Sequence, residues 1–297
     1  MKQTILITGS TGFLGRHLVQ KLNQLDYNII EINSTNFSKI WELEKNSINF
    51  IIHLAVKTAA GGYCKTHPGE QWIINNNINS EILTYWLNNQ PNSHMITFGS
   101  SCSYNADVIK SENNYLKGEV EEGYEVYGNL KRNLLVGLKA LNQEFGMTYN
   151  YFIPSVFYGP DYDLTDKHFI FDLIRKITNA KNGGAPVVLW GDGTQERELI
   201  YISDAVDIII QSITNKDTIK NICNLSSGNI YSLKTYAKTI CNIVDYDYNL
   251  IKWNSNAFVG AKSKKLINTY FKNFKFIDLK LGLNKTISYY INKLEEK

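Results

Sequence analysis

The side chains best suited to chemistry in this sequence are those of Tyr127 and Lys131. They are four residues apart in the segment Tyr127-Gly128-Asn129-Leu130-Lys131, so on a helix they share one face. An ammonium close to a phenol favours the ionised form of that phenol. We therefore expect Lys131 to lower the pKa of Tyr127, which would act as a general acid toward a bound substrate.

The spacing alone does not single out this pair, because other tyrosine–lysine pairs share it. Tyr248/Lys252 and Tyr289/Lys293 are also four residues apart, in a chain with 19 tyrosines. Tyr127 differs in position, since it follows a predicted strand that ends near Ser100 and opens an amphipathic helix. Position therefore makes Tyr127 the candidate.

Two more candidates, Ser100 and Cys102, follow the apolar strand at residues 94–98. They lie in the sequence Gly99-Ser100-Ser101-Cys102-Ser103-Tyr104. Ligands of open parallel sheets bind beyond the carboxyl ends of the strands. Both side chains are therefore expected where the chemistry occurs, although Cys102 could instead be a small buried apolar residue.

A glycine-rich turn, residues 8–15, links the first predicted strand to the first helix. Gly9 can take the positive φ of a tight turn, Gly12 lets a pyrophosphate approach the backbone, and Gly15 lets the helix lie close to the strand. The helix N-terminus adds unpaired N–H groups and the positive end of its dipole. The turn predicts dinucleotide binding, and the alternative is a structural turn without a phosphate.

Strand and helix signals alternate through the first half of the chain. The predicted strands cover residues 4–7, 27–32, 50–55, 94–98 and 221–225, and amphipathic segments lie between most of them. This alternation is typical of a parallel sheet covered on both faces. The sequence therefore predicts an α/β fold, a doubly wound parallel sheet of the Rossmann type.

After the second strand, Asn33 stands where such folds meet the adenosine ribose. A carboxylate there would bind the 2′-hydroxyl and repel a 2′-phosphate. Asn33 is neutral, and Arg16 could lie nearby, so NADP(H) is favoured over NAD(H). If Glu31 were the true end of the strand, the preference would reverse.

Two other polar positions predict structural roles. His53 ends the third strand, and we expect it to be structural rather than catalytic. The run of three asparagines at residues 75–77 falls inside a predicted helix, where asparagine has poor propensity. We expect one of these amides to bond a neighbouring loop.

Composition and charge narrow the class of protein. A chain of 297 residues with 43% hydrophobic content can form one large domain or two interlocked ones. A net charge of +3 gives no reason to expect nucleic acid or an acidic membrane as partner. The four scattered cysteines argue against a metal site and a disulfide framework. With no membrane-span or signal-type segment, we expect a cytoplasmic protein.

Together, the glycine turn, Ser100 and the Tyr127-x-x-x-Lys131 pair resemble the extended short-chain dehydrogenases/reductases. Within that superfamily, narrower segments resemble GDP-L-fucose synthase and related GDP-4-keto-sugar reductases. These segments are residues 57–68, 99–104, 154–160, 167–170 and 189–198. The likeness extends from about residue 4 to residue 207 and weakens beyond it.

The resemblance implies a mechanism for ketone reduction. Ser100 would hydrogen-bond the C4 keto oxygen, Tyr127 would protonate it as hydride arrives from NADPH, and Lys131 would hold the nicotinamide ribose. Cys102 and His168 match the acid/base pair that inverts C3 and C5 in the family. Their presence permits epimerisation without requiring it, and His168 could equally be a structural polar residue.

The resemblance also implies the binding contacts and partners. Arg197 would grip the substrate diphosphate, although it could instead form a surface ion pair, and Trp190 and Lys176 would contribute to the nucleotide pocket. A GDP-linked 4-keto sugar is the implied substrate, for capsule or O-antigen polysaccharide, and a homodimer is the implied assembly. Cofactor contacts are implied for Gly9, Thr11, Gly12, Phe13, Leu14, Gly15, Asn33, Leu54, Ala55, Lys131 and Pro154.

By the same resemblance, residues 1–160 and about 199–228 form the NADP-binding domain. Residues 161–198 and 229–297 form a smaller α/β substrate-binding domain. Val156 replaces an asparagine common in fucose synthases, the segment after Pro160 is short, and the tail matches poorly. These departures leave open another sugar such as a heptose, a nucleotide-sugar 4-epimerase or dehydratase that retains NAD, and a non-catalytic NADP-binding regulator.

Overall fold

The largest element of the computed structural model is a six-stranded parallel sheet with the strand order β2-β1-β3-β4-β5-β9. The structure describes residues 2–59, 62–214, 220–256 and 263–296. The strands of this sheet are β1 (Gln3–Thr8), β2 (Tyr27–Ile32), β3 (Phe50–His53), β4 (His94–Phe98), β5 (Tyr149–Pro154) and β9 (Ile222–Leu225). The order reverses between β1 and β3, where ligands of such sheets bind.

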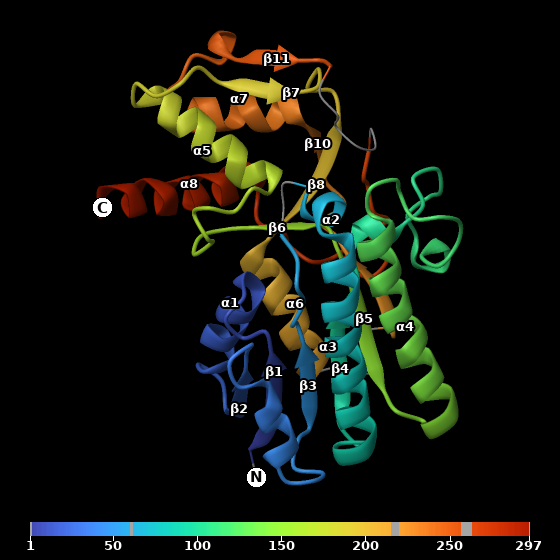
Figure 1. Ribbon diagram of the computed structural model, residues 1–297. Coiled ribbons are helices and arrows are strands. Elements are labelled where there is room, and N and C mark those ends of the chain that lie inside the picture. Colours follow the sequence, from blue (N-terminus) through green and yellow to red (C-terminus); the bar gives the residue numbers. More distant parts are fainter. Residues whose placement is uncertain (1, 60–61, 215–219, 257–262, 297) are drawn as a thin grey trace.

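Helices cover both faces of this sheet (Figure 1). One face is covered by α1 (Phe13–Leu22) and α6 (Ile202–Thr214), and the other by α3 (Pro68–Asn89) and α4 (Glu125–Phe145). The short helix α2 (Tyr63–Thr66) precedes α3. The predicted doubly wound parallel sheet is confirmed.

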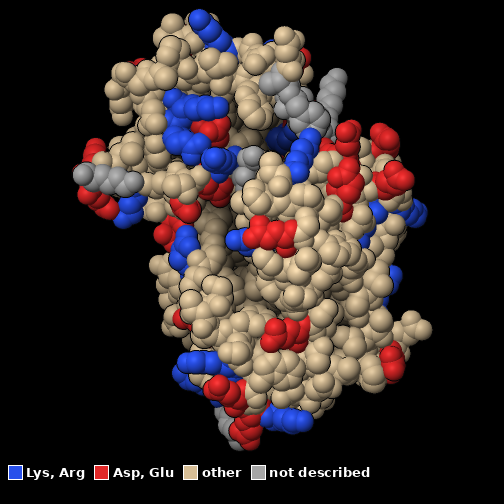
Figure 2. All heavy atoms as spheres, viewed as in Figure 1, with Lys and Arg blue, Asp and Glu red and all other residues tan. Residues whose placement is uncertain are grey.

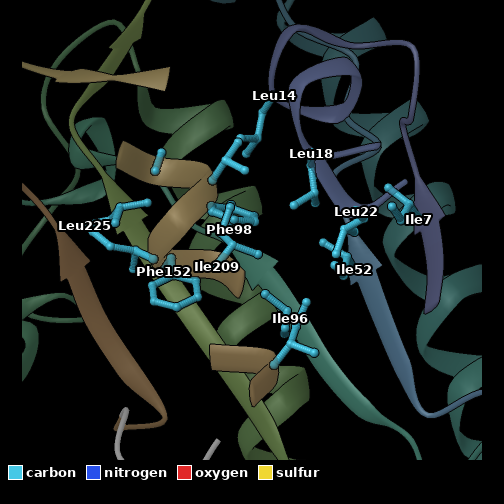
Figure 3. Close-up of a cluster of buried hydrophobic side chains, with 14 of the residues drawn as sticks. Ile7, Leu14, Leu18, Leu22, Ile52, Ile96, Phe98, Phe152, Ile209 and Leu225 are labelled. Atoms are coloured by element: carbon cyan, nitrogen blue, oxygen red, sulfur yellow. The ribbon is translucent and has the colours of Figure 1, made fainter. Parts of the chain in front are cut away.

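Apolar side chains alternate between the two faces of the strands, as the period of two requires. Ile5 and Ile7 of β1 are buried with α1 and α6, whereas Leu6 is buried with Trp86 of α3 and Leu135 of α4. Figure 3 shows part of the first cluster, with side chains from five strands, α1 and α6 pointing toward one another. These two clusters fix the carboxyl ends of the strands relative to one another.

The upper part of Figure 1 contains the remaining strands and helices, around a third apolar cluster. A three-stranded sheet has the order β10 (Ile230–Ser232), β8 (Glu196–Tyr201) and β6 (Val156–Tyr158), and β11 (Lys252–Asn254) pairs with β7 (Val188–Trp190). The helices are α5 (Phe169–Lys181), α7 (Leu233–Val244) and α8 (Leu279–Glu295). Since β8 crosses the proposed boundary at residue 198, the division into domains stays a prediction.

An extended stretch at residues 263–267 joins the two parts. Ser263 forms a parallel bridge with Glu196, and Leu266 forms one with Lys110. The Leu266 N–H donates to the Glu198 carboxylate at 3.1 Å. These bonds bring a segment close to the C-terminus against the loop that follows β4. Within the described ranges, no helix is long and apolar enough to span a membrane.

Candidate active site

The glycine turn between β1 and α1 is packed too closely for side chains. Gly9 has a φ of +72°, and a Cβ there would lie 2.8 Å from the Ala55 nitrogen. A Cβ on Gly15 would overlap the carbonyl oxygens of Gly9 and Ser10. Because these neighbours are backbone atoms, they cannot move aside as a side chain would. The turn and the start of α1 therefore form a bare peptide surface.

This surface fits the pyrophosphate of a dinucleotide. The first N–H groups of a helix have no intrahelical acceptor, and together with the helix dipole they favour an anion. The Ser10 hydroxyl is buried and has no hydrogen-bond partner among the described residues. Leu54 and Ala55 close the other side of the turn, because their N–H groups donate to the Thr8 carbonyl at 3.1 Å and the Thr8 hydroxyl at 3.3 Å.

The end of β2 lies against the same turn. The Gly9 N–H donates to the Ile32 carbonyl at 2.8 Å, which puts Asn33 next to the turn. The Asn33 side-chain oxygen accepts from the Thr35 N–H at 2.9 Å and from the Thr35 hydroxyl at 2.7 Å. Asn33 is not a carboxylate, so it carries no charge that would repel a 2′-phosphate. The side-chain oxygen of Asn33 is already used in the two bonds to Thr35.

Arg16 is already engaged by groups of the protein. Its guanidinium forms an ion pair with Asp161 at 3.0 Å and donates to the Thr11 carbonyl at 2.6 Å. Arg16 therefore links α1 to the segment after β6. Its expected position near the adenosine ribose stays a prediction.

Ser100 is held by its neighbours at the carboxyl end of β4. Its hydroxyl accepts from the Cys102 N–H at 3.2 Å and so caps the turn of 3₁₀-helix at Ser101–Ser103. Its own N–H donates to the hydroxyl of the buried Tyr115 at 3.2 Å. The Tyr115 hydroxyl is 3.1 Å from that of Tyr151, which donates to the Lys131 carbonyl at 2.7 Å. A chain of tyrosines thus joins Ser100 to the backbone of α4.

Tyr127 and Lys131 lie on one face of α4, next to Ser100. The Lys131 ammonium is 5.9 Å from the centre of the Tyr127 ring, and the Tyr127 hydroxyl hydrogen-bonds the Ser100 side chain. Gly128 lets α4 pack closely against Val120, because a Cβ at this position would overlap the Val120 side chain. The structure therefore brings together the three residues that the sequence selected for ketone reduction.

The expected low pKa of Tyr127 is not found in the protein without a cofactor. Burial raises the pKa of Tyr127, and the hydrogen bond from Ser100 opposes only part of that rise. Burial also lowers the pKa of Lys131 to about 8. Spacing shows that two groups are neighbours, whereas desolvation acts on both of them and favours their neutral forms. A lower pKa of Tyr127 beside the positive nicotinamide ring stays a prediction.

His53 and Asn75 have structural roles, as the sequence predicted. The His53 ring is buried, with its Nδ1 2.7 Å from the Thr8 hydroxyl and its Nε2 3.2 Å from the Asn79 side-chain oxygen. Burial lowers the pKa of His53 to about 4. Asn75 bonds both the N–H and the carbonyl of Lys57, at 2.8 and 3.0 Å, and so fixes the loop before α2.

Cys102 is half-buried and lies beside a charged pair that the sequence did not indicate. The Lys264 ammonium is 3.7 Å from the Cys102 sulfur and 3.0 Å from the Glu121 carboxylate. Both charged side chains are about nine-tenths buried. Arg197, half-buried on β8, interacts electrostatically with Cys102 and Glu121. Two cations and one carboxylate therefore surround the thiol.

His168 lies outside this cluster. It precedes α5, its side chain is 47% exposed, and its Nδ1 is 2.7 Å from the Asp166 carboxylate. Among the contacts of the described residues, none joins His168 to Cys102. Its role as the second acid/base stays a prediction.

The other predicted substrate contacts lie at the surface of the upper part. Trp190 ends β7 with 64% of its area exposed. Lys176 on α5 forms an ion pair with Asp172 at 2.7 Å, and Arg175 pairs with the same carboxylate. Figure 2 shows Lys and Arg side chains gathered on the upper half of this face, where Figure 1 shows α5 and α7. An anionic ligand would be attracted to this region.

This geometry suits reduction of a carbonyl at the carboxyl edge of the sheet. A hydroxyl donor, a phenol and an ammonium lie together at the edge of the sheet that also carries a turn fit for a dinucleotide. Residues 5–226 match the NAD dependent epimerase/dehydratase family.

The chain belongs to that family.

Members with curated names match almost the whole chain. GDP-L-colitose synthase of Yersinia pseudotuberculosis is 28% identical over 97% of this chain and 98% of its own length. GDP-L-fucose synthase of Escherichia coli (strain K12) is 25% identical over 98% of this chain and 97% of its own length. The predicted membership of the extended short-chain dehydrogenases/reductases is confirmed.

Solved structures show the same fold at lower identity. The crystal structure of a GDP-6-OMe-4-keto-L-xylo-heptose reductase from C. jejuni has a TM-score of 0.84 at 19% identity and covers 98% of both chains. A UDP-glucose 4-epimerase of Thermotoga maritima has a TM-score of 0.80, also at 19% identity, over 98% of this chain and all of its own. Because reductases and epimerases share this fold, the fold alone does not distinguish their reactions.

Sequence reasoning missed Glu121, Lys264 and the tyrosines that hold Ser100. Lys264 lies in a lysine-rich stretch in the last part of the chain. On composition alone, such a stretch predicts an exposed segment. Tyr115 and Tyr151 are two of 19 tyrosines, with no special spacing. The only usable signal was the acidic pair Glu121-Glu122 shortly before Tyr127, and it resembles an ordinary solvated turn.

Proposed function

We propose that this protein reduces the C4 keto group of a GDP-linked 4-keto sugar with NADPH. The observation that carries the proposal is the grouping of Ser100, Tyr127 and Lys131 at the carboxyl edge of the sheet, the edge that also carries the glycine turn. The names of the full-length relatives, which include two GDP-sugar synthases, support the GDP-linked substrate. The sugar of this GDP-linked substrate is a deoxyhexose or a heptose.

The glycine turn at Gly9, Gly12 and Gly15 would hold NADPH, which would supply the hydride for the C4 carbon of the sugar. Ser100 donates a hydrogen bond to the keto oxygen and so stabilises the negative charge that develops there. Tyr127 passes its hydroxyl proton to that oxygen, which completes the alcohol. Lys131 stabilises the phenolate that remains until Tyr127 takes up a proton again.

The proposal includes inversion at carbons next to the ketone before reduction. Protons at C3 and C5 are acidified by the C4 carbonyl, so a thiolate can remove one. Cys102 is positioned for this step because it is two residues from Ser100. His168 is the proposed partner on the opposite face of the sugar.

NADP(H) is the proposed cofactor, as the neutral Asn33 favours. A relative with the same fold is a GDP-L-fucose synthetase from Naegleria fowleri bound to NADP. A 4-epimerase with retained NAD is the alternative reaction, because the fold of a UDP-glucose 4-epimerase also matches. We further propose a cytoplasmic homodimer that takes its substrate from a GDP-sugar dehydratase reaction.

The test is to incubate the purified protein with NADPH and either GDP-4-keto-6-deoxymannose or its heptose homologue, in deuterated water. We expect stoichiometric loss of NADPH absorbance and deuterium at C3 and C5 of the product. Label without NADPH oxidation would support an isomerase. Tightly bound NAD and no response to either substrate would overturn the reductase proposal.

Replacing the general acid gives the sharpest check on the mechanism. We expect Tyr127→Phe to lower kcat by a factor of about 10² to 10⁴, because the oxygen loses its proton donor, while NADPH binding persists. Tyr248→Phe is the matched control, since Tyr248 has a lysine at the same spacing but lies in a 3₁₀ turn after α7. Unchanged activity in Tyr127→Phe would instead support a non-catalytic regulator.

A further inference from the structure

A lysine is buried beside the candidate thiol. Lys264 is 9% exposed, and its ammonium lies between three groups. It is 3.0 Å from the Glu121 carboxylate, 3.7 Å from the Cys102 sulfur and 4.4 Å from the centre of the Tyr124 ring. Burying a charge is costly unless partners compensate for it, so this arrangement needs an explanation.

The groups around Cys102 carry more positive than negative charge. Lys264 and Arg197 are the cations that interact with it, and Glu121 is the carboxylate that holds both of them. Three further described residues that interact with Cys102 are weak acids that are neutral at pH 7, namely Tyr124, Tyr127 and Cys64. Lys110, buried on the far side, also interacts with Glu121 and Lys264.

The position of Lys264 is fixed by the backbone on both sides of it. Ser263 forms a bridge with Glu196, and the Leu266 N–H is bonded to Glu198. The ammonium is therefore held at the thiol across 162 residues of sequence, and a flexible surface lysine could not maintain this contact. Interactions with Cys102, Tyr124 and Glu121 raise the pKa of Lys264 despite its burial, so the ammonium stays charged.

We propose that Lys264, held by Glu121, is a positioning residue that stabilises the thiolate form of Cys102. A thiolate is the form that can remove a proton, and a cation within about 4–6 Å favours the ionised form of an acid. The inference rests on the proposed function for its catalytic meaning, because the thiolate would be the base that acts at C3 or C5. The proposed effect of Lys264 on the Cys102 thiol does not require a substrate.

The test measures the pKa of the thiol directly. The full-length protein, without substrate or cofactor, is alkylated with iodoacetamide over a range of pH, and the Cys102 peptide is quantified by mass spectrometry. We expect Lys264→Met to move the midpoint of the pH profile upward by about one unit. At pH 7 alkylation slows by about three- to tenfold, since a more basic thiolate is also more nucleophilic.

Three variants separate the charge effect from misfolding. Lys264→Arg keeps the cation, so we expect its midpoint to stay near that of the wild type. Lys265→Met removes the adjacent exposed lysine and is expected to change nothing. In Glu121→Gln/Lys264→Met no carboxylate is left buried without its lysine, and we expect its midpoint to rise by less than in Lys264→Met, because the negative charge of Glu121 is also removed.

An unchanged midpoint in the folded Lys264→Met and double variants would overturn the inference and leave Lys264 as a ligand or packing residue. The alkylation experiment needs no reaction, so its failure is distinct from failure of the reductase assay. If the alkylation experiment and the reductase assay both give the expected results, we expect the pH profile of deuterium incorporation at C3 and C5 to shift to higher pH in Lys264→Met. Lys264→Arg restores the wild-type profile.

Discussion

At the scale of single residues, burial decides the protonation of the groups around the site. Spacing suggested that Lys131 would make Tyr127 acidic, yet desolvation raises the pKa of that phenol and lowers that of Lys131. A neutral phenol is the form that donates a proton in a reduction. The free protein therefore holds Tyr127 in the form that donates a proton.

His53 makes stability depend on pH. Its pKa is about 4 when folded and 6.5 as the ordinary value, so between these values the unfolded chain binds the extra proton. Its contribution is present above pH 6.5 and is lost as pH falls toward 4, by about 3 kcal/mol in total. Urea unfolding at pH 7 and pH 4.5 should show this loss, and it should be smaller in His53→Gln.

The exposed His67 supplies the control for that measurement. His67→Gln removes a histidine that lies at the surface, so we expect the difference in unfolding free energy between the two pH values to remain as in the wild type. If His53→Gln keeps the full pH dependence, other groups carry it.

At the scale of elements, the close contact of α1 with the glycine turn is open to test. Gly15→Ala would push a methyl group into two backbone carbonyl oxygens, so α1 must move. We expect a loss of about 1–3 kcal/mol in unfolding free energy and a large loss of NADPH affinity. Thermal unfolding and fluorescence titration with NADPH measure the two effects.

Gly69→Ala is the matched control because a Cβ there meets open space near the start of α3. Alanine favours a helix over glycine by up to about 1 kcal/mol, so this variant should be slightly more stable and bind NADPH normally. Normal NADPH affinity in Gly15→Ala would show that the dinucleotide does not depend on this contact.

The sequence predicts elements well where one local pattern decides them. Continuous apolar runs mark β3 and β4 because both faces of a parallel sheet are buried, and the glycine spacing marks the turn before α1. The Lys264 contact could not be predicted, because it depends on pairing between residues 110, 196 and 263–267. The Arg16–Asp161 ion pair was missed for a similar reason, since it joins residues that are 145 apart in the sequence.

At the scale of the whole molecule, the proposed dimer can be tested through its helices. Trp72 and Ile73 of α3 and Val136 of α4 are large apolar residues with 41%, 61% and 52% of their area exposed. Such residues are enriched where a partner covers them. We expect the wild type to have the mass of a dimer in light scattering and Ile73→Glu/Val136→Glu to be monomeric.

Leu281→Glu serves as the control, because Leu281 is 51% exposed and belongs to α8, a helix of the upper part in Figure 1, whereas α3 and α4 cover the six-stranded sheet. It should keep the mass of the wild type. A monomeric wild-type protein would reject the dimer while leaving the catalytic proposal unaffected.

The stretch at residues 263–267 also has a consequence for biosynthesis. A ribosome makes Cys102 early, yet the ammonium beside it emerges only when most of the polypeptide has been translated. On the proposed role of Lys264, a chain cut before this stretch would hold Cys102 without the cation beside it. We expect the Cys102 thiol of such a chain to react more slowly with iodoacetamide at pH 7 than that of the whole protein.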